Sequence, residues 1–164
     1  MATYNDPMEN SATLRLVVNQ SSQSVEDNTS TDSWSLTLLC TNGLSNTGFP
    51  KPWSVSIGDS DYDGTFTFDF RSSTSKLIAS GSTVVEHDED GTKTISVTAE
   101  VDASPVSIGA GAISDDFTQT RIPRGPKVEV DGEWTNSVAH VEVDGAWEVC
   151  LVYAEVDGAW ELVA

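Results

Sequence analysis

The chain has 164 residues, a length that suits one compact domain with an appendage. Its 26 Asp and Glu residues stand against 8 Lys and Arg, giving a formal net charge of −18 at pH 7. A chain this acidic is repelled by nucleic acids and by anionic membrane surfaces, so neither is an expected partner. The first residues contain no basic stretch and no apolar run, so neither a signal peptide nor a membrane anchor is expected there.

In chain order, the first segment is polar, and residues 1–12 are expected to form an N-terminal arm or docking strand. A first strand is predicted where Leu14, Leu16 and Val18 alternate with residues of the opposite face, because alternation is the pattern of a half-buried strand. Residues 19–33 are rich in Ser, Thr, Asn and Asp, and this composition predicts a loop or an irregular edge.

Further strands are predicted at about 33–40, 53–57, 65–70, 77–86 and 95–101, followed by a broken strand over 106–122. Their expected inward residues include Trp34, Leu36, Trp53, Val55, Phe66, Phe68, Ile95 and Val97. No stretch has a helical period over three turns. Short strands with turn signals every 8 to 12 residues are typical of an antiparallel β-sandwich, so the predicted fold class is all-β.

The divisions we expect are an arm (1–12), an Ig-like sandwich (13–124), a linker (125–127) and a β-hairpin repeat segment (128–164). The linker lies beside Pro123 and Pro126. The sandwich lacks a Cys-Trp-Cys spacing, so an antibody-type disulfide between its sheets is not expected. Cys40 and Cys150 are predicted to be reduced and buried thiols.

The repeat segment contains one pattern three times, at residues 128–134 (VEVDGEW), 141–147 (VEVDGAW) and 154–160 (AEVDGAW). Each Asp-Gly pair follows a Val, and Asp-Gly between such arms is a strong hairpin signal because Gly adopts positive φ without strain. Three hairpins in series are therefore predicted. The sequence leaves the loop length open: a two-residue loop pairs Val143 with Ala146, and a three-residue loop pairs it with Trp147.

The repeats are the main candidate site, either as packing surfaces or as ligand contacts. Candidate residues are Trp134, Trp147 and Trp160, with the turn residues Asp131, Gly132, Asp144, Gly145, Asp157 and Gly158. A short hairpin buries little alone, so the segment is expected to pack on its own domain or on another chain. The alternative is capture of a sugar or choline by the tryptophans.

A second candidate is a calcium site at residues 59–64 (DSDYDG), because oxygens at positions 1, 3 and 5 before a Gly resemble the start of a calcium loop. Its ligands would be Asp59, Asp61 and Asp63. Position 12 holds Phe70 where such a loop has a carboxylate, and a plain hairpin turn explains the glycines equally well. We therefore expect no cofactor, with calcium as the alternative.

Catalysis is not expected. Only His87 and His140 could serve as imidazole bases, and neither lies near a recognisable nucleophile motif. No phosphate-binding glycine loop, Cys-x-x-Cys or His-Glu-x-x-His occurs. His87 is interpreted as a turn residue that is hydrogen-bonded to the backbone.

Several segments resemble Ig-like domains in minor structural proteins of tailed bacteriophages. These segments are residues 14–21 (LRLVVNQS), 28–36, 84–87 (VVEH) with 90–97 (DGTKTISV), and 120–124 (TRIPR). The Val-Asp-Gly-x-Trp repeats also look like C-terminal repeats of phage tail and fibre proteins. The resemblance implies a virion location, made in the host cytoplasm, and a structural or adhesive role.

The function we expect is that of a minor tail or tail-tip protein acting in assembly. The alternatives are a capsid decoration protein on the head and a carbohydrate-binding adhesin for the host surface. Expected partners are other virion proteins, further copies of the chain in a homo-oligomer and, for the adhesin, a surface glycan. Neighbouring subunits are expected at the sheet edges and at the N-terminal arm.

Overall fold

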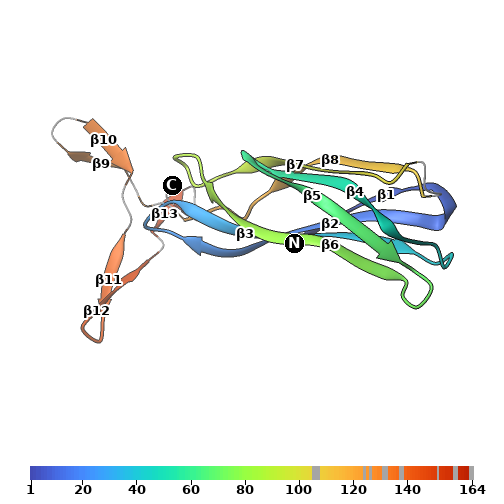
Figure 1. The fold of residues 1–164 in the computed structure, drawn as a ribbon. Helices are drawn as coiled ribbons and strands as arrows, with labels where there is room; N and C mark the ends of the chain where they lie inside the picture. The colour runs from blue at the N-terminus through green and yellow to red at the C-terminus, as the bar shows by residue number, and fades with distance from the viewer. Residues whose placement is uncertain are drawn as a thin grey trace.

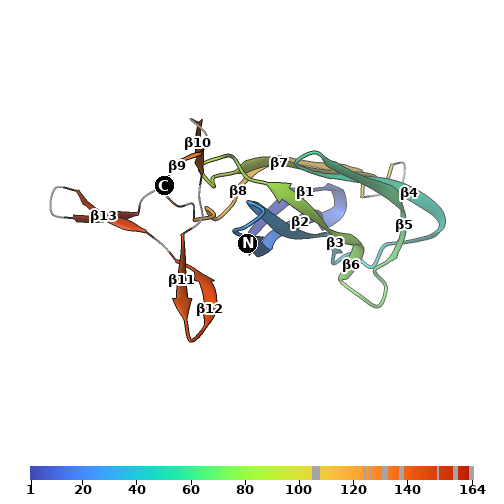
Figure 2. The ribbon, with the colours of Figure 1, turned by 90° about the vertical axis from the view of Figure 1, so that its left-hand side faces the viewer.

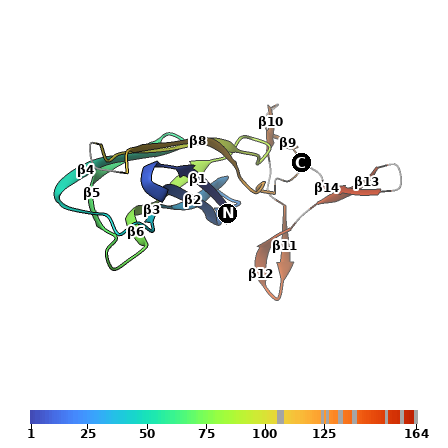
Figure 3. The same cartoon turned by 90° about the vertical axis from the view of Figure 1, so that its right-hand side faces the viewer.

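The computed structural model describes residues 1–104, 108–123, 125, 127–130, 133–136, 139–150, 152–156 and 159–162. They form two four-stranded antiparallel sheets and three two-stranded hairpins, so the predicted all-β sandwich is confirmed. Figure 1 shows the two sheets stacked face to face, with the hairpins beyond one end of the stack. The views in Figure 2 and Figure 3 show the same arrangement from the two sides.

The first sheet has the order β1-β2-β3-β6, and the second has the order β5-β4-β7-β8. The strands of the first sheet are β1 (Ala2–Pro7), β2 (Ala12–Ser24), β3 (Thr29–Cys40) and β6 (Ser75–Glu86), with a short 3-10 turn, η1 (Glu9–Ser11), between β1 and β2. The strands of the second sheet are β4 (Ser45–Ile57), β5 (Ser60–Asp69), β7 (Thr94–Asp102) and β8 (Ala110–Thr118). The hairpins are β9 (Lys127–Val130) with β10 (Glu133–Asn136), β11 (His140–Val143) with β12 (Ala146–Val149), and β13 (Tyr153–Val156) with β14 (Ala159–Leu162).

The core lies between the sheets and follows the predicted alternation. Along residues 12–18 of β2 and along β3 every second side chain is buried, including Leu14, Leu16, Leu36 and Leu38. The opposite sheet contributes Val55, Ile57, Phe66, Phe68, Ile95 and Val97. Each large side chain so buried contributes roughly 1.5–3 kcal/mol, which explains why the alternation determines the sheet faces.

The indole of Trp34 fills one region of this core and is matched by a glycine on the neighbouring strand. Trp34 and Gly81 are cross-strand partners in β3 and β6. A Cβ atom added to Gly81 would lie 2.8 Å from Cζ2 of Trp34, so this position has no room for a side chain. The ring also packs against Tyr62, with ring centroids 4.8 Å apart.

Two segments for which the sequence left alternatives open are both strands. Of an arm or a docking strand at 1–12, the structure has a strand, β1, which pairs with β2 from Ala2 opposite Val18 to Pro7 opposite Thr13. Polar side chains suit an edge strand, because one of its backbone edges has no neighbouring strand. The expected loop at 19–33 is instead the outer end of a long β2–β3 hairpin, since Ser and Thr on a solvated face still form ladder hydrogen bonds.

The broken strand predicted over 106–122 is shorter than expected. Strand β8 begins at Ala110 and ends at Thr118, and residues 105–107 lie outside the described residues. Cys40 is buried and Cys150 is half-buried, and both are free thiols. In the part of the chain that the structure describes, no helix is long and apolar enough to cross a membrane.

The edges of the two sheets are joined by side chains. At one side, the Tyr4 hydroxyl of β1 donates to the Asp116 carbonyl of β8 at 2.8 Å. The Asp6 carboxylate accepts a hydrogen bond from the Ala112 N–H at 2.9 Å. Burial and the charges of Asp115 and Asp116 raise the pKa of Tyr4, so its hydroxyl stays protonated and remains a donor.

At the other side, Tyr62 of β5 donates to the Ser82 carbonyl of β6 at 3.1 Å. The hydroxyls of Ser60 and Thr83 lie 2.7 Å apart. The edge strands β1, β8, β5 and β6 therefore face each other across the sandwich.

Candidate functional site

The hairpin β11–β12 is closed by a two-residue loop. Asp144 and Gly145 have φ values of 51° and 84°, and positive φ at both loop positions is the mark of a type I′ turn. Val143 therefore pairs with Ala146, and Glu142 pairs with Trp147. Of the two loop lengths that the sequence allows, the structure has the shorter one.

This register places the tryptophan and the valines on opposite faces of the hairpin. Directly opposite residues share a face, so Val141 and Val143 lie on one face, and Glu142 and Trp147 lie on the other. Both faces are open to solvent: the valines are 45% and 43% exposed, and Trp147 is 71% exposed. This hairpin thus presents apolar surface on both sides.

The other two hairpins have the same backbone register. Trp134 is opposite Glu129, and Trp160 is opposite Glu155. Their turn residues Asp131, Gly132, Asp157 and Gly158 lie outside the described residues. Within the described residues, the strands of each hairpin pair only with each other, so the described candidate residues fall on three separate two-stranded units.

The chain leaves the sandwich through a fixed exit, residues 119–122. The Ile122 N–H donates to the Gly91 carbonyl at 2.9 Å, and Ile122 itself is fully buried. The Arg121 Nε donates to the Asp90 carbonyl at 2.9 Å. This exit is bound to the turn between β6 and β7, so the repeat segment begins from an anchored point.

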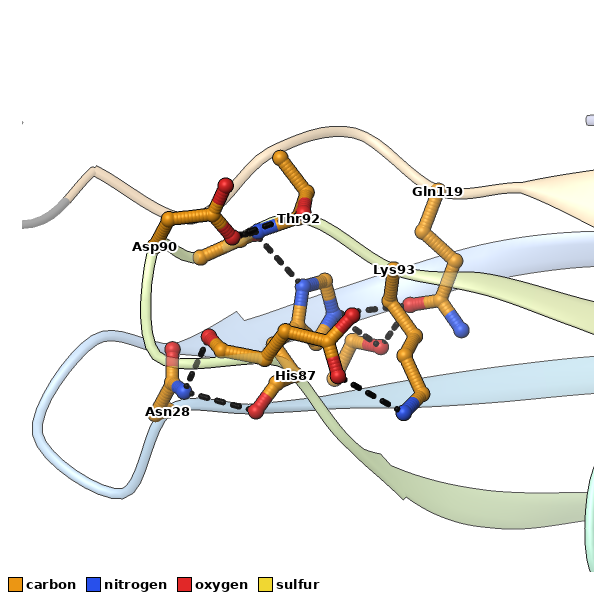
Figure 4. A network of polar contacts seen from close by, with 9 residues as sticks. Asn28, His87, Asp90, Thr92, Lys93 and Gln119 are labelled. Atoms are coloured by element: carbon orange, nitrogen blue, oxygen red, sulfur yellow. Dashed lines mark hydrogen bonds and ion pairs between the residues drawn. The ribbon is translucent and has the colours of Figure 1, made fainter.

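A buried polar network fastens the same exit (Figure 4). The Gln119 amide donates to the Asp32 carboxylate at 2.9 Å. Its oxygen lies 2.8 Å from Nε2 of His87 and accepts a hydrogen bond from the Ser30 hydroxyl. Nδ1 of His87 lies 2.8 Å from the Gly91 carbonyl. His87 is a turn residue bonded to the backbone, as predicted, and the network also joins three separate segments.

The hydrogen-bond roles in this network follow from the amide. A carbonyl only accepts, so Nδ1 of His87 carries a proton toward Gly91. The Gln119 NH₂ donates to Asp32, and its oxygen accepts from the Ser30 hydroxyl. Nε2 of His87 lies 3.0 Å from the Ser30 hydroxyl oxygen and 2.8 Å from the Gln119 oxygen, so His87 is linked through Gln119 to the Asp32 carboxylate. Burial raises the pKa of Asp32, and the charge of His87 opposes that rise.

Sequence reasoning missed Gln119 and Asp32, although a signal was present. Asp32 lies two residues before Trp34 on β3, so it occupies an inward register position among apolar residues. It is fully buried, and Gln119 is nearly so. A charged residue on the buried face of a strand needs partners, which points to a network whose other members come from distant segments.

The calcium candidates lie along a β-hairpin rather than around a loop. Asp59 is in the turn between β4 and β5, while Asp61 and Asp63 are on β5 opposite Ser56 and Ser54. Alternate residues of a strand are roughly 6.6 Å apart, and both carboxylates face solvent. Among the described residues, no group of three or more His, Cys, Asp or Glu side chains is placed to hold a metal ion.

The outer face of the second sheet has a hollow of about 490 Å³ that the sequence does not indicate. Strands β4, β7 and β8 form it, and its lining includes Pro52, Ser54, Glu100, Asp102 and Ala112. The small side chains of Ser54 and Ala112 leave the space, and the two carboxylates make it acidic.

A known protein family matches most of the chain. The family described as Siphovirus protein of unknown function (DUF859) matches residues 1–148. The matched stretch contains the whole sandwich, the hairpin β9–β10 and all of β11–β12 except its last residue. No curated protein and no solved structure matches the chain.

Proposed function

Because the chain belongs to this siphovirus family, we propose that it is a structural protein of a tailed-phage particle, placed as a minor tail or tail-tip protein. The supporting observation is the contrast between the two parts of the molecule. Side chains join the edge strands of the sandwich in pairs, while three hairpins extend from an anchored exit with apolar surface exposed on both faces of β11–β12.

The sandwich is proposed to be Ig-like. The order β2-β3-β6 follows the A-B-E order of an immunoglobulin sheet, and β5-β4-β7-β8 follows the order C′-C-F-G. Ig-like sandwiches serve as rigid carriers of binding segments, since function lies in sites added to the fold. This comparison of strand order supports the resemblance to phage structural proteins.

Assembly is proposed to use the hairpins more than the sheet edges. An open edge strand invites strand addition, but β1 and β8 are joined by Tyr4 and Asp6 on one side of the sandwich. On the other side Tyr62 joins β5 to β6. A two-stranded hairpin is marginal alone, so the hairpins gain stability by docking on a partner.

The proposed role is binding rather than catalysis. Both ring nitrogens of His87 are engaged in the buried network, so this imidazole is not free to act as a base. His140 is exposed on the hairpin β11–β12. Among the residues that the structure describes, neither histidine is set with the nucleophile and orienting acid that nucleophilic catalysis requires.

Two other roles are the alternatives. A head decoration protein would use the same sandwich with the hairpins on the capsid. An adhesin for a host surface glycan is favoured by the exposed ring of Trp147, because aromatic faces stack on sugars. For the adhesin, changing all three repeat tryptophans to Ala should abolish cell binding and leave particle assembly intact.

The composition of purified particles tests the proposal. Mass spectrometry of purified phage should find peptides from both the sandwich and the repeat segment. A phage encoding the chain truncated after residue 126 should lose the sandwich from its particles, since the hairpins are the docking element. Intact particles without a trace of the chain would overturn the proposal.

A further inference from the structure

Each hairpin sets one glutamate opposite one tryptophan. The pairs are Glu129 with Trp134, Glu142 with Trp147, and Glu155 with Trp160. In a hairpin with a two-residue loop, the residues that flank the loop exchange hydrogen bonds, so the next pair outward is a non-hydrogen-bonded pair. The side chains of such pairs are the closest across the ladder. The same register therefore sets a glutamate opposite a tryptophan at the equivalent position of every repeat.

The hairpin β11–β12 shows that such a pair is accessible. Trp147 is 71% exposed, and Glu142 is exposed on the same face. An indole face attracts a cation through its quadrupole, and a carboxylate next to it adds charge attraction. The pair thus has the chemistry to hold a Lys or Arg side chain, with Arg favoured because its planar guanidinium both stacks and hydrogen-bonds.

The charge of the segment points to the same kind of partner. Residues 128–164 contain nine Asp and Glu residues and no Lys or Arg. Two copies of this segment would repel each other, so docking of hairpin on hairpin is opposed. A basic segment of another chain is attracted to it, because complementary charge steers association and suppresses wrong partners.

Short connections also tie the repeats to one another. Three residues separate β10 from β11, and three separate β12 from β13. Such a connection spans at most about 15 Å between the strand ends, so one partner segment can meet successive hairpins. Binding of one cationic side chain then raises the effective concentration of the next, and weak single contacts combine into strong binding.

We propose that the three hairpins form a multivalent receptor for an arginine- or lysine-rich segment of another virion protein. Each Glu–Trp pair holds one cationic side chain between its carboxylate and its ring face. This inference rests on the proposed structural function, for which it specifies the chemistry of the docking partner.

The test uses the full chain and a fluorescently labelled oligo-arginine peptide, followed by anisotropy at about 0.15 M salt, where long-range attraction is screened. One variant neutralises the glutamates opposite the tryptophans, as Glu129→Gln, Glu142→Gln and Glu155→Gln. Its control neutralises the three glutamates that pair elsewhere, as Glu133→Gln, Glu148→Gln and Glu161→Gln. Both triple variants remove three charges from the same segment.

The inference predicts that the first variant weakens peptide binding by at least about tenfold, because multivalent binding multiplies the loss at each site. The control should change the affinity by less than about threefold, as expected for screened charges. Equal losses in the two variants would overturn the inference, because the attraction would then depend on net charge alone. Absence of peptide binding by the natural chain would also overturn it.

Two further results separate this inference from the proposed function. If purified particles contain the chain but the peptide does not bind, the inference fails and the structural role stands. The second result is binding of host cell-wall material to the chain. If this binding survives the triple Glu→Gln variant but is lost when Trp134, Trp147 and Trp160 are all changed to Ala, the hairpins recognise a glycan and the inference fails.

Discussion

Removing the amide of Gln119 should strongly destabilise the sandwich, because three segments depend on that one side chain. Gln119 donates to Asp32 and accepts from Ser30, and its oxygen lies 2.8 Å from Nε2 of His87. The substitution Gln119→Leu keeps a similar volume and removes every polar contact. The Asp32 carboxylate and the His87 ring then lose a buried partner each.

The size of the effect follows from these two groups. Leaving a buried donor or acceptor unsatisfied costs about 1–3 kcal/mol, and more for a charged group. Two such groups make a loss of roughly 2–6 kcal/mol in the free energy of unfolding, which is a large part of the 5–15 kcal/mol typical of a domain. With an m value of about 2 kcal/mol/M, the urea midpoint should fall by roughly 1–3 M.

The assay is urea unfolding followed by circular dichroism, with Gln23→Leu as the matched control. Gln23 also reaches this end of the sandwich, since its amide donates to the Thr120 carbonyl at 2.8 Å, but its side chain is exposed. Its loss should stay within about 0.5 kcal/mol, as for other surface changes. If Gln119→Leu costs no more than Gln23→Leu, the network does not hold the exit and the reasoning is refuted.

Three further predictions concern packing, pH and metal. Gly81→Ala should lower the unfolding free energy by about 1–3 kcal/mol, because the added Cβ would lie 2.8 Å from the Trp34 ring. The control is Gly48→Ala, which should be near neutral in the same urea titration because no atom lies within 4 Å of its added Cβ. Burial raises the folded-state pKa of Asp32 above its ordinary 3.8. Protonated Asp32 therefore contributes fully to the free energy of unfolding below pH 3.8, and this contribution is lost as the pH rises through the raised pKa. The stability of Asp32→Asn relative to the natural chain should therefore increase from about pH 3 to pH 6, and a constant difference would contradict this. The hairpin geometry of Asp59, Asp61 and Asp63 predicts that millimolar Ca²⁺ leaves the melting temperature unchanged. A rise in the melting temperature that Asp61→Asn removes would contradict this and would support a calcium site.

The sandwich could be predicted from the sequence because its information is local. Leu14, Leu16 and Val18 on β2 alternate with outward residues, and this period of two assigns the buried face without knowledge of the neighbouring strands. The same rule misses strands that are polar on both faces. For this reason β1 was expected as an arm or a docking strand, and the outer β2–β3 ladder as a loop or an irregular edge.

Long-range contacts set the limits of prediction for the network and for the repeats. The Gln119–Asp32 contact joins residues 87 positions apart, and nothing near Gln119 in the sequence indicates it. For the repeats, Asp144-Gly145 predicts a hairpin but allows two loop lengths. Only the backbone, with positive φ at both positions, places Trp147 opposite Glu142 instead of Val143.

Immunogold electron microscopy of purified phage, with an antibody raised against residues 1–122, tests the central claim most directly. The proposed function predicts label at the tail or its tip. Label over the head would replace the tail position with capsid decoration and keep the structural role. Absence of label from intact particles, together with absence of the chain from their protein composition, would contradict the account.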